Sequence, residues 1–290
     1  MSDSPFARTY LEWSDLRAVQ SLGRRWVRVY GIGTGQLGPA AQQVAGPTKI
    51  NVLSARQAIT IGQPPNQALR FDGGAFDASA ISAALRKLGA RQVDAGGQHF
   101  LALGAEHSVN VNSPLAEFGV INELDRVVVT DHTVAAGPAQ APVLAILGGG
   151  RALGAVPEYK AAAGCLGNVV AAVIAPGSSL ALPAGQLVAI GEQRPPSGTS
   201  PVNELLCTVG GSPAVANREV AAVRRALAPH AVLPGTQESA GSVVAAVSAG
   251  RADANGLTVV RALITLRPTR PAGFLYELLA RRYIGPLLGG

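Results

Sequence analysis

Ile59–Pro65, with the sequence ITIGQPP, begins an order of segments that the chain follows twice. A strand-like apolar run ends here at a Gly-Gln step and two prolines, and a second strand-like run follows at Ala68–Phe71. A Gly-Gly pair and a helical run over Ala78–Leu88 complete the order. Proline cannot donate to a β-ladder, so the two prolines place a bend at the end or edge of a sheet.

The second occurrence starts at Val188–Pro196, with the sequence VAIGEQRPP. It leads into an apolar run at Leu205–Val209, another Gly-Gly pair and a helical run over Ala214–Leu227. Two copies of one order of strand, bend, strand, turn and helix predict an internal duplication of one folding unit.

We expect each copy to be an α+β unit, in which helices cover one face of a mainly antiparallel sheet. A ferredoxin-like unit of the split βαβ type is the nearest simple model. The triple glycine Gly148–Gly150 is the best linker, so the predicted halves are residues 1–150 and 151–290. They either pack separately or share one continuous core or sheet, which would hide edge strands that otherwise invite aggregation.

Periodicity and capping residues predict the other elements. Apolar residues at helical spacing predict a helix over Tyr10–Leu22, and the apolar segment Trp26–Tyr30 predicts a short strand. Asp77 or Ser79 is placed to cap the helix of the first copy, and Gly89 to end it in a left-handed conformation. The remaining predicted strands and helices lie at Gln92–Val93, His99–Leu103, Val120–Leu124, Arg126–Thr130, Val134–Ala136, Ala141–Leu147, Tyr159–Leu166, Val169–Ile174, Val243–Val247, Leu257–Leu266 and Gly273–Tyr283.

Composition and charge exclude several classes of protein. The 290 residues are 48% hydrophobic, which is enough to bury a core and argues against disorder. The net charge is +6, but the basic residues are scattered and have no interleaved stacking aromatics, so we predict no nucleic-acid binding. No apolar run of about 18 residues exists, which predicts no transmembrane segment. The first residues, MSDSP, lack the apolar region of a signal peptide.

Two cysteines, Cys165 and Cys207, make up the thiol content of the chain. Neither belongs to a Cys-x-x-Cys pair, so they do not indicate a zinc site. Cys165 falls on a predicted helix and Cys207 on a predicted strand of the same half. Either the two sulfurs form a disulfide across that helix and strand, or both residues are free thiols packed as small hydrophobic side chains.

Motifs for a cofactor or a metal are weak. Gly31–Gly38 follows an apolar run and resembles a dinucleotide-binding loop, but its expected third glycine is Gln36. The four histidines have no spacing that would let two of them share a metal on a helix. We therefore predict no cofactor and no metal.

Candidate catalytic residues are few. His107 follows an acidic residue, and His132 follows Asp131, so each histidine would suit acid–base chemistry if the fold placed it in a cleft. The simpler interpretation is a turn residue at His132 and a loop residue at His107. Glu123 and Asp125 are two apart on a predicted strand and so share a face, either as a carboxylate pair for glycoside hydrolysis or as the solvent face of an edge strand.

Arg70 and Arg261 each interrupt an apolar strand-like run. On alternating strands, each of these arginines is expected to face solvent.

The segments Tyr159–Ala172 and Ile61–Pro65 resemble stretches of uncharacterised, exported or lipoprotein-type actinobacterial proteins. The resemblance covers most of the chain as a loose structural pattern. It implies an extracytoplasmic α+β module and transfers no catalytic residue. In an oxidising compartment of this kind, a Cys165–Cys207 disulfide is favoured.

These observations predict a non-catalytic binding or scaffold protein outside the cytoplasm, although the absence of a leader leaves a cytoplasmic location open. Its partner would be another protein or an apolar small molecule held between the halves. One alternative is a hydrolase-like enzyme with a cleft between the halves that uses His107, Asp131 or His132. Another is a protein that binds membrane surfaces peripherally through its basic residues.

Overall fold

A computed structural model describes residues 1–148, 150–183 and 185–290 and divides the chain into two compact units. Unit 1 contains Met1–Ala18 and Tyr30–Leu153, and unit 2 contains Val19–Val29 and Gly154–Gly290. The predicted halves, 1–150 and 151–290, differ from these units mainly by the segment Val19–Val29. Gly149, in the middle of the predicted linker, lies outside the described residues.

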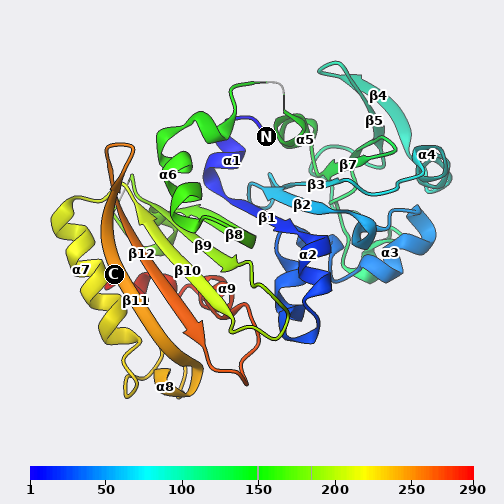
Figure 1. The fold of residues 1–290 in the computed structure, drawn as a ribbon. Coiled ribbons are helices and arrows are strands. Elements are labelled where there is room, and N and C mark those ends of the chain that lie inside the picture. Colours follow the sequence, from blue (N-terminus) through cyan, green and yellow to red (C-terminus); the bar gives the residue numbers. More distant parts are fainter. Residues whose placement is uncertain (149, 184) are drawn as a thin grey trace. The chain divides into compact units, whose positions relative to one another are not determined.

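Unit 1 is an antiparallel sheet with helices (Figure 1). Its strands lie in the order β1-β2-β3-β7-β6-β5-β4, and each neighbouring pair is antiparallel. The elements are α1 (Pro5–Thr9), β1 (Leu11–Asp15), η2 (Gly35–Leu37), α3 (Ala41–Thr48), η3 (Val52–Ser54), β2 (Gln57–Ile61), β3 (Ala68–Asp72), α4 (Ala78–Lys87), β4 (Arg91–Ala95), β5 (Gln98–Ala102), η4 (Ala116–Phe118), β6 (Arg126–Val129), β7 (Thr133–Gly137) and α5 (Gln140–Leu147).

The repeated segment of unit 1 folds as the sequence predicts. Strands β2 and β3 flank the bend at Pro64-Pro65, where the peptide bond between the two prolines is cis. The Asp77 carboxylate accepts a hydrogen bond from the Ala80 N–H and begins α4. Gly89, which follows the helix, has a φ of +102°.

Helices cover both faces of the unit 1 sheet. Successive residues of a strand point to opposite faces, so two neighbouring residues of β3 show which helices lie on each face. On β3, Phe71 is fully buried in a core cluster that includes Val44 of α3 and Ile81 of α4. The neighbouring residue, Arg70, points to the other face, where its guanidinium donates to the Ile146 and Leu147 carbonyls at the end of α5. The expectation that helices cover one face is therefore wrong for this unit.

Unit 2 is also an antiparallel sheet with helices (Figure 1). Its strands lie in the order β11-β12-β10-β9-β8, with each neighbouring pair antiparallel. The elements are α6 (Pro157–Leu166), β8 (Val169–Pro176), η6 (Gly177–Leu180), β9 (Leu187–Gln193), β10 (Asn203–Val209), α7 (Pro213–Ala226), α8 (Ala240–Val243), β11 (Val244–Ala254), β12 (Leu257–Leu266), α9 (Phe274–Ala280) and α10 (Ile284–Leu287).

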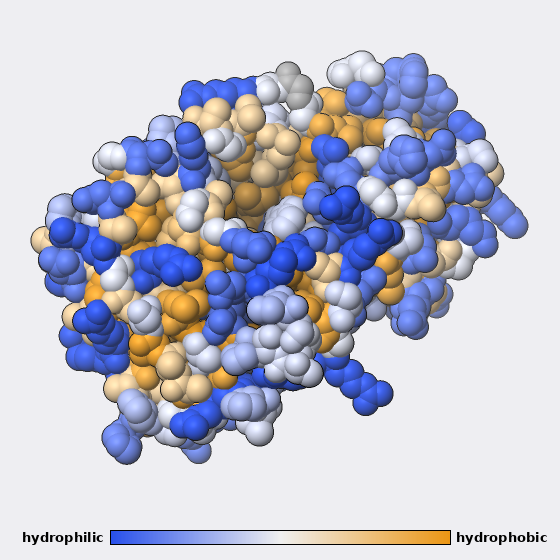
Figure 2. Space-filling view, in the orientation of Figure 1, coloured by the Kyte–Doolittle hydropathy of each residue, from blue (hydrophilic) through white to orange (hydrophobic). Residues whose placement is uncertain are grey.

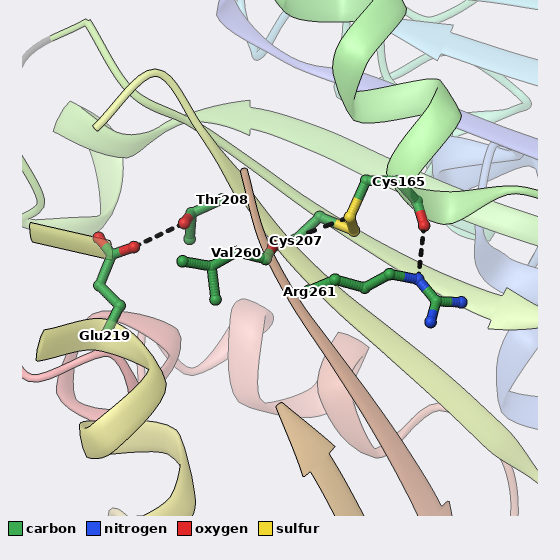
Figure 3. The surroundings of a disulfide bond; sticks show 6 residues. All are labelled: Cys165, Cys207, Thr208, Glu219, Val260 and Arg261. Atoms are coloured by element: carbon green, nitrogen blue, oxygen red, sulfur yellow. Dashed lines mark hydrogen bonds between the residues drawn. A yellow bond between two sulfur atoms is a disulfide. The ribbon is translucent and has the colours of Figure 1, made fainter. Parts of the chain in front are cut away.

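A disulfide joins Cys165 of α6 to Cys207 of β10, so the first of the two interpretations of the cysteines is confirmed. Figure 3 shows Cys207 pointing toward α6 while the next residue, Thr208, points toward Glu219 of α7. Helices α6 and α7 therefore cover opposite faces of this sheet. Arg261 is the cross-strand partner of Cys207 and donates to the Cys165 carbonyl at the end of α6, over 2.9 Å.

The two units share a connectivity. In each, a helix precedes a three-stranded meander (β1-β2-β3 or β8-β9-β10), a helix follows it (α4 or α7), and the last strand returns beside the third strand of the meander. Unit 1 contains an additional hairpin, β4-β5. In unit 2, α7 joins β10 to β11 with β12 between them, which is a split βαβ connection. The meander that begins each unit is not part of a ferredoxin-like order, so the predicted ferredoxin-like units are not confirmed.

Two predictions at the start of the chain are wrong. The predicted helix over Tyr10–Leu22 is instead β1 followed by the short helix α2 (Leu16–Ser21), because residues Leu11–Asp15 pair with β2. The predicted strand at Trp26–Tyr30 lies in the 3-10 helix η1 (Arg24–Gly31). Trp26 and Val29 are both fully buried three residues apart, which matches the three residues per turn of that helix.

The predicted strand at Val120–Leu124 is a turn. The carboxylate of Glu123 accepts hydrogen bonds from the N–H groups of Ile121 and Asn122, over 2.9 and 3.2 Å. These local bonds occupy backbone donors that a strand would offer to a neighbour. The strand begins after this turn, at Arg126.

Candidate functional sites

A groove runs along the outer side of α3 and α4 in unit 1. It has a volume of about 650 Å³ and is lined by Gly46, Pro47, Lys49, Ala80, Ala83, Ala84, Lys87 and Leu88. The buried sides of the same helices, including Val44 and Ile81, fill the core, so the groove is the exposed seam between them. Figure 2 shows orange and pale-orange residues among blue ones over α3 and α4. We call this surface the α3–α4 groove.

Two charged side chains stand in an otherwise uncharged lining of the α3–α4 groove. Lys49 follows the last residue of α3, and Lys87 is the last residue of α4; both are exposed. The chain has three lysines, and the third, Lys160, is an exposed residue of α6. The groove therefore combines a surface of small apolar side chains with two primary ammonium groups.

A second cavity of unit 1, of about 150 Å³, lies where the loop 103–125 closes on itself. Its lining is part apolar and part polar: Leu88, Leu103, Gly104, Ser108, Asn110, Asn112, Ser113, Pro114, Leu115, Val120, Ile121, Leu124 and Asp125. Asp125 is 6% exposed, and its Oδ2 accepts a hydrogen bond from the Ser108 hydroxyl over 3.3 Å. We call this cavity the Asp125 pocket.

The environment of Asp125 favours its neutral form. Burial raises the pKa of this carboxyl to about 6, while the Ser108 hydroxyl and the nearby Arg126 and His107 oppose the shift. The Arg126 guanidinium donates to the backbone carbonyls of Gly104 and Asp125 rather than to the carboxylate. Among the described residues, no ion pair joins Asp125 to a cation.

Unit 2 contains a pair of buried carboxyl groups. Glu192 of β9 and Glu204 of β10 are direct cross-strand partners and are 2% and 0% exposed. Glu204 accepts three hydrogen bonds, from the N–H groups of Gly273, Phe274 and Leu275 at the start of α9, over 2.6 to 2.9 Å. Among the described residues, Oε2 of Glu192 has no hydrogen-bond partner.

The two glutamates cannot both be ionised at low cost, since like charges directly opposite on a sheet repel. Burial and the charge of Glu204 raise the pKa of Glu192 well above its usual range. Burial also raises the pKa of Glu204, to about 7, although the three N–H groups of α9 oppose that shift. The hydrogen bonds therefore assign the charge to Glu204 and the proton to Glu192. This arrangement fastens α9 to the sheet, and it lines none of the three cavities described for the two units.

A third cavity, of about 420 Å³, lies along α7 and is lined by residues of unit 2. Arg218 and Arg225 of α7 border it, together with Leu288 and the two glycines that follow. Glu219 also lines it, but this carboxylate is 3% exposed and accepts hydrogen bonds from Thr208 and Gln186. Over β11, β12 and α7, apolar and polar residues are interspersed in Figure 2.

The predicted catalytic candidates are not brought together. Asp131 and His132 are exposed in the β6–β7 turn, where the Asp131 carboxylate accepts from the Ala78 N–H at the start of α4. His107 is exposed in a loop at the other end of β7, where its N–H donates to the Pro138 carbonyl and its Nδ1 lies 3.0 Å from the Pro65 carbonyl. The five residues of β7 separate the two places, a span of roughly 16 Å.

Glu123 and Asp125 do not share a strand face, because they lie in the turn before β6. Glu123 bonds to its own backbone neighbours, and Asp125 is buried in the Asp125 pocket. Both interpretations made from the sequence, a catalytic pair and a solvent-facing edge, are therefore wrong for Asp125. Arg261 is exposed, as expected, and also donates to the Cys165 carbonyl at the end of α6. Arg70 is half-buried and donates to carbonyls at the end of α5.

Sequence reasoning did not identify the α3–α4 groove, the Asp125 pocket or the glutamate pair. A partial signal existed for the glutamates, because Glu192 and Glu204 each lie beside an apolar strand-like run. Lys49 and Lys87 gave no signal, since the two residues are brought near each other by the packing of α3 against α4.

Other observations limit the kinds of site. Across residues 1–148, 150–183 and 185–290, no three His, Cys, Asp or Glu side chains are grouped so that they would hold a metal ion. In the same residues, every helix is too short or too polar to cross a bilayer. No family model, curated protein or solved structure matches this chain.

Proposed function

We propose that this protein is a non-catalytic binding protein, and that the α3–α4 groove of unit 1 binds an anionic amphiphile. The ligand would be a molecule with an alkyl chain and a carboxylate or phosphate head. The observation that carries the proposal is the combination of an apolar groove with two of the three lysines of the chain.

The size and lining of the groove support an alkyl ligand. Its volume of about 650 Å³ falls within the range of about 300–1,000 Å³ that small-molecule sites usually have. Ala80, Ala83 and Ala84 leave space that larger side chains would fill. An alkyl chain in this space removes apolar surface from water on both partners, at roughly 25 cal/mol per Å².

The charges of the groove support an anionic head. Lysine lays its apolar stem along an apolar surface and keeps its ammonium in water, so Lys49 and Lys87 extend the groove and charge its rim. An exposed ion pair contributes roughly 0.2–1 kcal/mol. Two such pairs provide selectivity for the head, and the alkyl chain provides most of the affinity.

The Cys165–Cys207 disulfide supports a location outside the cytoplasm. Disulfides persist in oxidising compartments and are rare where thioredoxin and glutathione keep thiols reduced. The bridge lies between a buried strand and the end of a helix, as a structural bond would. An exported protein that carries an amphiphile also agrees with the first of the functions expected from the sequence.

The shared connectivity supports descent of the two units from one duplicated module. Each unit has a meander, a helix and a returning strand, and the helices α4 and α7 both start at a side-chain cap. The inserted hairpin β4-β5 and the α3–α4 groove belong to unit 1. Under this proposal, the copy in unit 1 binds the ligand.

A fluorescence titration tests the proposal. The full chain is titrated with 11-(dansylamino)undecanoate, whose emission rises and shifts to the blue in an apolar site. We expect saturable binding by the unmodified chain, and the double variant Lys49→Glu/Lys87→Glu should weaken it about tenfold. The matched control is Lys160→Glu, which changes the third lysine and leaves the groove intact.

Ala83→Trp provides a steric test of the same groove. Ala83 is exposed, so the larger side chain fills the groove without entering the core, and binding should be lost. Undecanol, which has no charge, should displace the dansyl probe from both chains, and its affinity should be the same for the unmodified chain and the lysine variant. Equal binding by Lys49→Glu/Lys87→Glu and the unmodified chain would refute the proposal. The proposal would also be refuted if the chain sedimented with anionic vesicles but bound no monomeric amphiphile.

A further inference from the structure

Asp125 is a buried carboxylate without a cation partner, and it faces an open space. It is 94% hidden from solvent, yet it lines the Asp125 pocket of about 150 Å³. A carboxylate buried in this way is costly unless a cation or several donors compensate it. Among the described residues, this carboxylate accepts one hydrogen bond, from the Ser108 hydroxyl over 3.3 Å.

Gly104 lets the polar groups converge on this space. A Cβ at position 104 would lie 2.5 Å from the Ser108 hydroxyl oxygen and 3.0 Å from Oδ1 of Asp125. Any larger residue would therefore displace Ser108 and push against the carboxylate. The glycine leaves both oxygens on the wall of the pocket, where the amides of Asn110 and Asn112 also lie.

Arg126 does not neutralise the carboxylate. Although adjacent in sequence, its guanidinium donates to the Gly104 and Asp125 carbonyls over 2.7 and 2.8 Å, and its Nε lies 3.7 Å from the Glu106 carboxylate. His107 is exposed and turned toward Pro65. The charge of Asp125 is therefore available to a ligand.

We infer that the Asp125 pocket binds a small organic ammonium ion, with its N–H groups donating to the Asp125 carboxylate and its short alkyl part against the leucine side chains. This site is separate from the proposed amphiphile site, with which it shares Leu88 in its lining.

Size and lining favour an organic ammonium over a metal ion. A pocket of about 150 Å³ has room for several water molecules, which is more space than a bare ion fills. Calcium and magnesium take six or more oxygen ligands, commonly with several carboxylates, whereas this pocket offers one carboxylate. Its apolar half, formed by Leu103, Leu115 and Leu124, suits methylene groups.

Titration calorimetry of the full chain with ethylammonium tests the inference. We expect saturable binding to the unmodified chain and at least a tenfold loss in Asp125→Asn, which keeps the shape of the side chain and removes its charge. Glu123→Gln is the matched control: it removes an acidic residue two positions away that bonds to its own backbone. Its affinity should stay within twofold of that of the unmodified chain.

Asn110→Trp covers the case in which Asp125→Asn does not fold. Asn110 is exposed at the pocket, so a tryptophan there blocks the entrance without changing the core, and ethylammonium binding should again fall at least tenfold. Tetramethylammonium has the same charge but no N–H donor and should bind at least tenfold more weakly than ethylammonium.

The pH dependence gives an independent readout. Since burial raises the pKa of Asp125 to about 6, the carboxylate loses its charge as the pH falls through that value. Ethylammonium affinity should be constant above pH 7 and fall about tenfold for each pH unit below 6. Arg126, His107 and Glu123 are the charged groups that act on Asp125, so Glu123→Gln and His107→Gln should shift the midpoint while retaining the fall.

Four results would overturn the inference. They are equal binding by Asp125→Asn and the unmodified chain, tighter binding of tetramethylammonium than of ethylammonium, displacement of ethylammonium by equimolar calcium, and no detectable ethylammonium binding at pH 7.5. Because Lys49 and Lys87 are not involved, the amphiphile titration and this one can fail independently.

Discussion

Helices α4 and α7 occupy the same position in the connectivity of their units, yet their exposed sides differ. The outer side of α4 borders an apolar groove with lysines at its rim, and a loop next to its end forms the Asp125 pocket. Along α7, two arginines border a cavity whose buried carboxylate, Glu219, already has two hydrogen-bond donors. At these cavities, one connectivity therefore supports a carboxylate with one long hydrogen bond in unit 1 and a carboxylate with two donors in unit 2.

The two units are also stabilised by different interactions. Unit 2 has the disulfide and the glutamate pair that holds α9, whereas the described residues of unit 1 contain neither. Unit 1 depends on an apolar cluster and on the hydrogen bonds of Arg70. Substitutions at these places should therefore affect one unit and leave the other, and amide hydrogen exchange reports each unit separately in the full chain.

The largest expected effect comes from the disulfide. Replacing both Cys165 and Cys207 by alanine opens a loop of 42 residues, which lowers the free energy of unfolding by about 4 kcal/mol in the chain-entropy account. Exchange in strands β8–β12 should accelerate accordingly, and exchange in β1–β7 should not change. Equal acceleration in both units would show that they do not unfold separately.

The glutamate pair should make the stability of unit 2 depend on pH. The pKa values of Glu192 and Glu204 are raised in the folded state, so the folded chain binds more protons than the unfolded one. The stability from this protonation is complete below about pH 4.5 and decreases as the pH rises through about 7, by roughly 1.4 kcal/mol per pH unit and group. Unfolding of unit 2, followed by exchange between pH 5 and 8, should show this slope.

Glu192→Gln should flatten that slope and stabilise unit 2 by roughly 1–3 kcal/mol at pH 8, because the glutamine cannot ionise beside Glu204. Glu219→Gln is the matched control, since it changes another buried carboxylate of the same unit and leaves Glu192 and Glu204 in place. A slope as steep in Glu192→Gln as in the unmodified chain would contradict the assignment of the proton to Glu192, since only the contribution of Glu204 should remain.

The two strand arginines allow a direct comparison of the units. Arg70→Met should cost unit 1 about 2 kcal/mol, since it removes two bonds to the end of α5 and an ion pair with Asp72. Arg261→Met should cost unit 2 about 1 kcal/mol, since it removes a single bond to the end of α6. Denaturant unfolding followed by hydrogen exchange measures both losses. A larger loss in Arg261→Met than in Arg70→Met would contradict this account.

The smallest expected effects come from the two helix caps. Asp77 accepts from the Ala80 N–H in unit 1 over 2.9 Å, and Ser212 accepts from the Val215 N–H in unit 2 over 3.3 Å. Replacing either residue by alanine should cost its own unit about 1 kcal/mol. Similar losses would strengthen the equivalence of α4 and α7; no loss in one of them would weaken it.

The sequence predicted the elements whose signals are local. The repeated order of strands and helices, the cap at Asp77 and the left-handed Gly89 are all present, and so is the antiparallel α+β architecture. Residues Leu11–Asp15 show where this reasoning ends: their apolar spacing fits a helix, but pairing with β2 makes them a strand. Tertiary contacts decided that segment, and they have no local signal.

The candidate sites depend on tertiary contacts that have no signal in the sequence. Lys49 and Lys87 lie 38 positions apart and come together through helix packing, and Asp125 acquires its character from the closure of a loop. The sequence placed Glu123 and Asp125 two apart on a predicted strand and therefore on one face. The local hydrogen bonds of Glu123 occupy backbone donors that such a strand would use. The disulfide was an exception, because the sequence placed Cys165 and Cys207 on a helix and a strand of the same half, where they could pair.

Hydrogen–deuterium exchange of the full chain, with and without saturating 11-(dansylamino)undecanoate, tests most directly whether unit 1 is the binding unit. The account predicts slower exchange in Ala41–Thr48 and Ala78–Lys87, the helices of the groove, and no change in Pro213–Ala226, their counterpart in unit 2. Protection confined to Pro213–Ala226, or bound ligand without protection of α3 and α4, would contradict it.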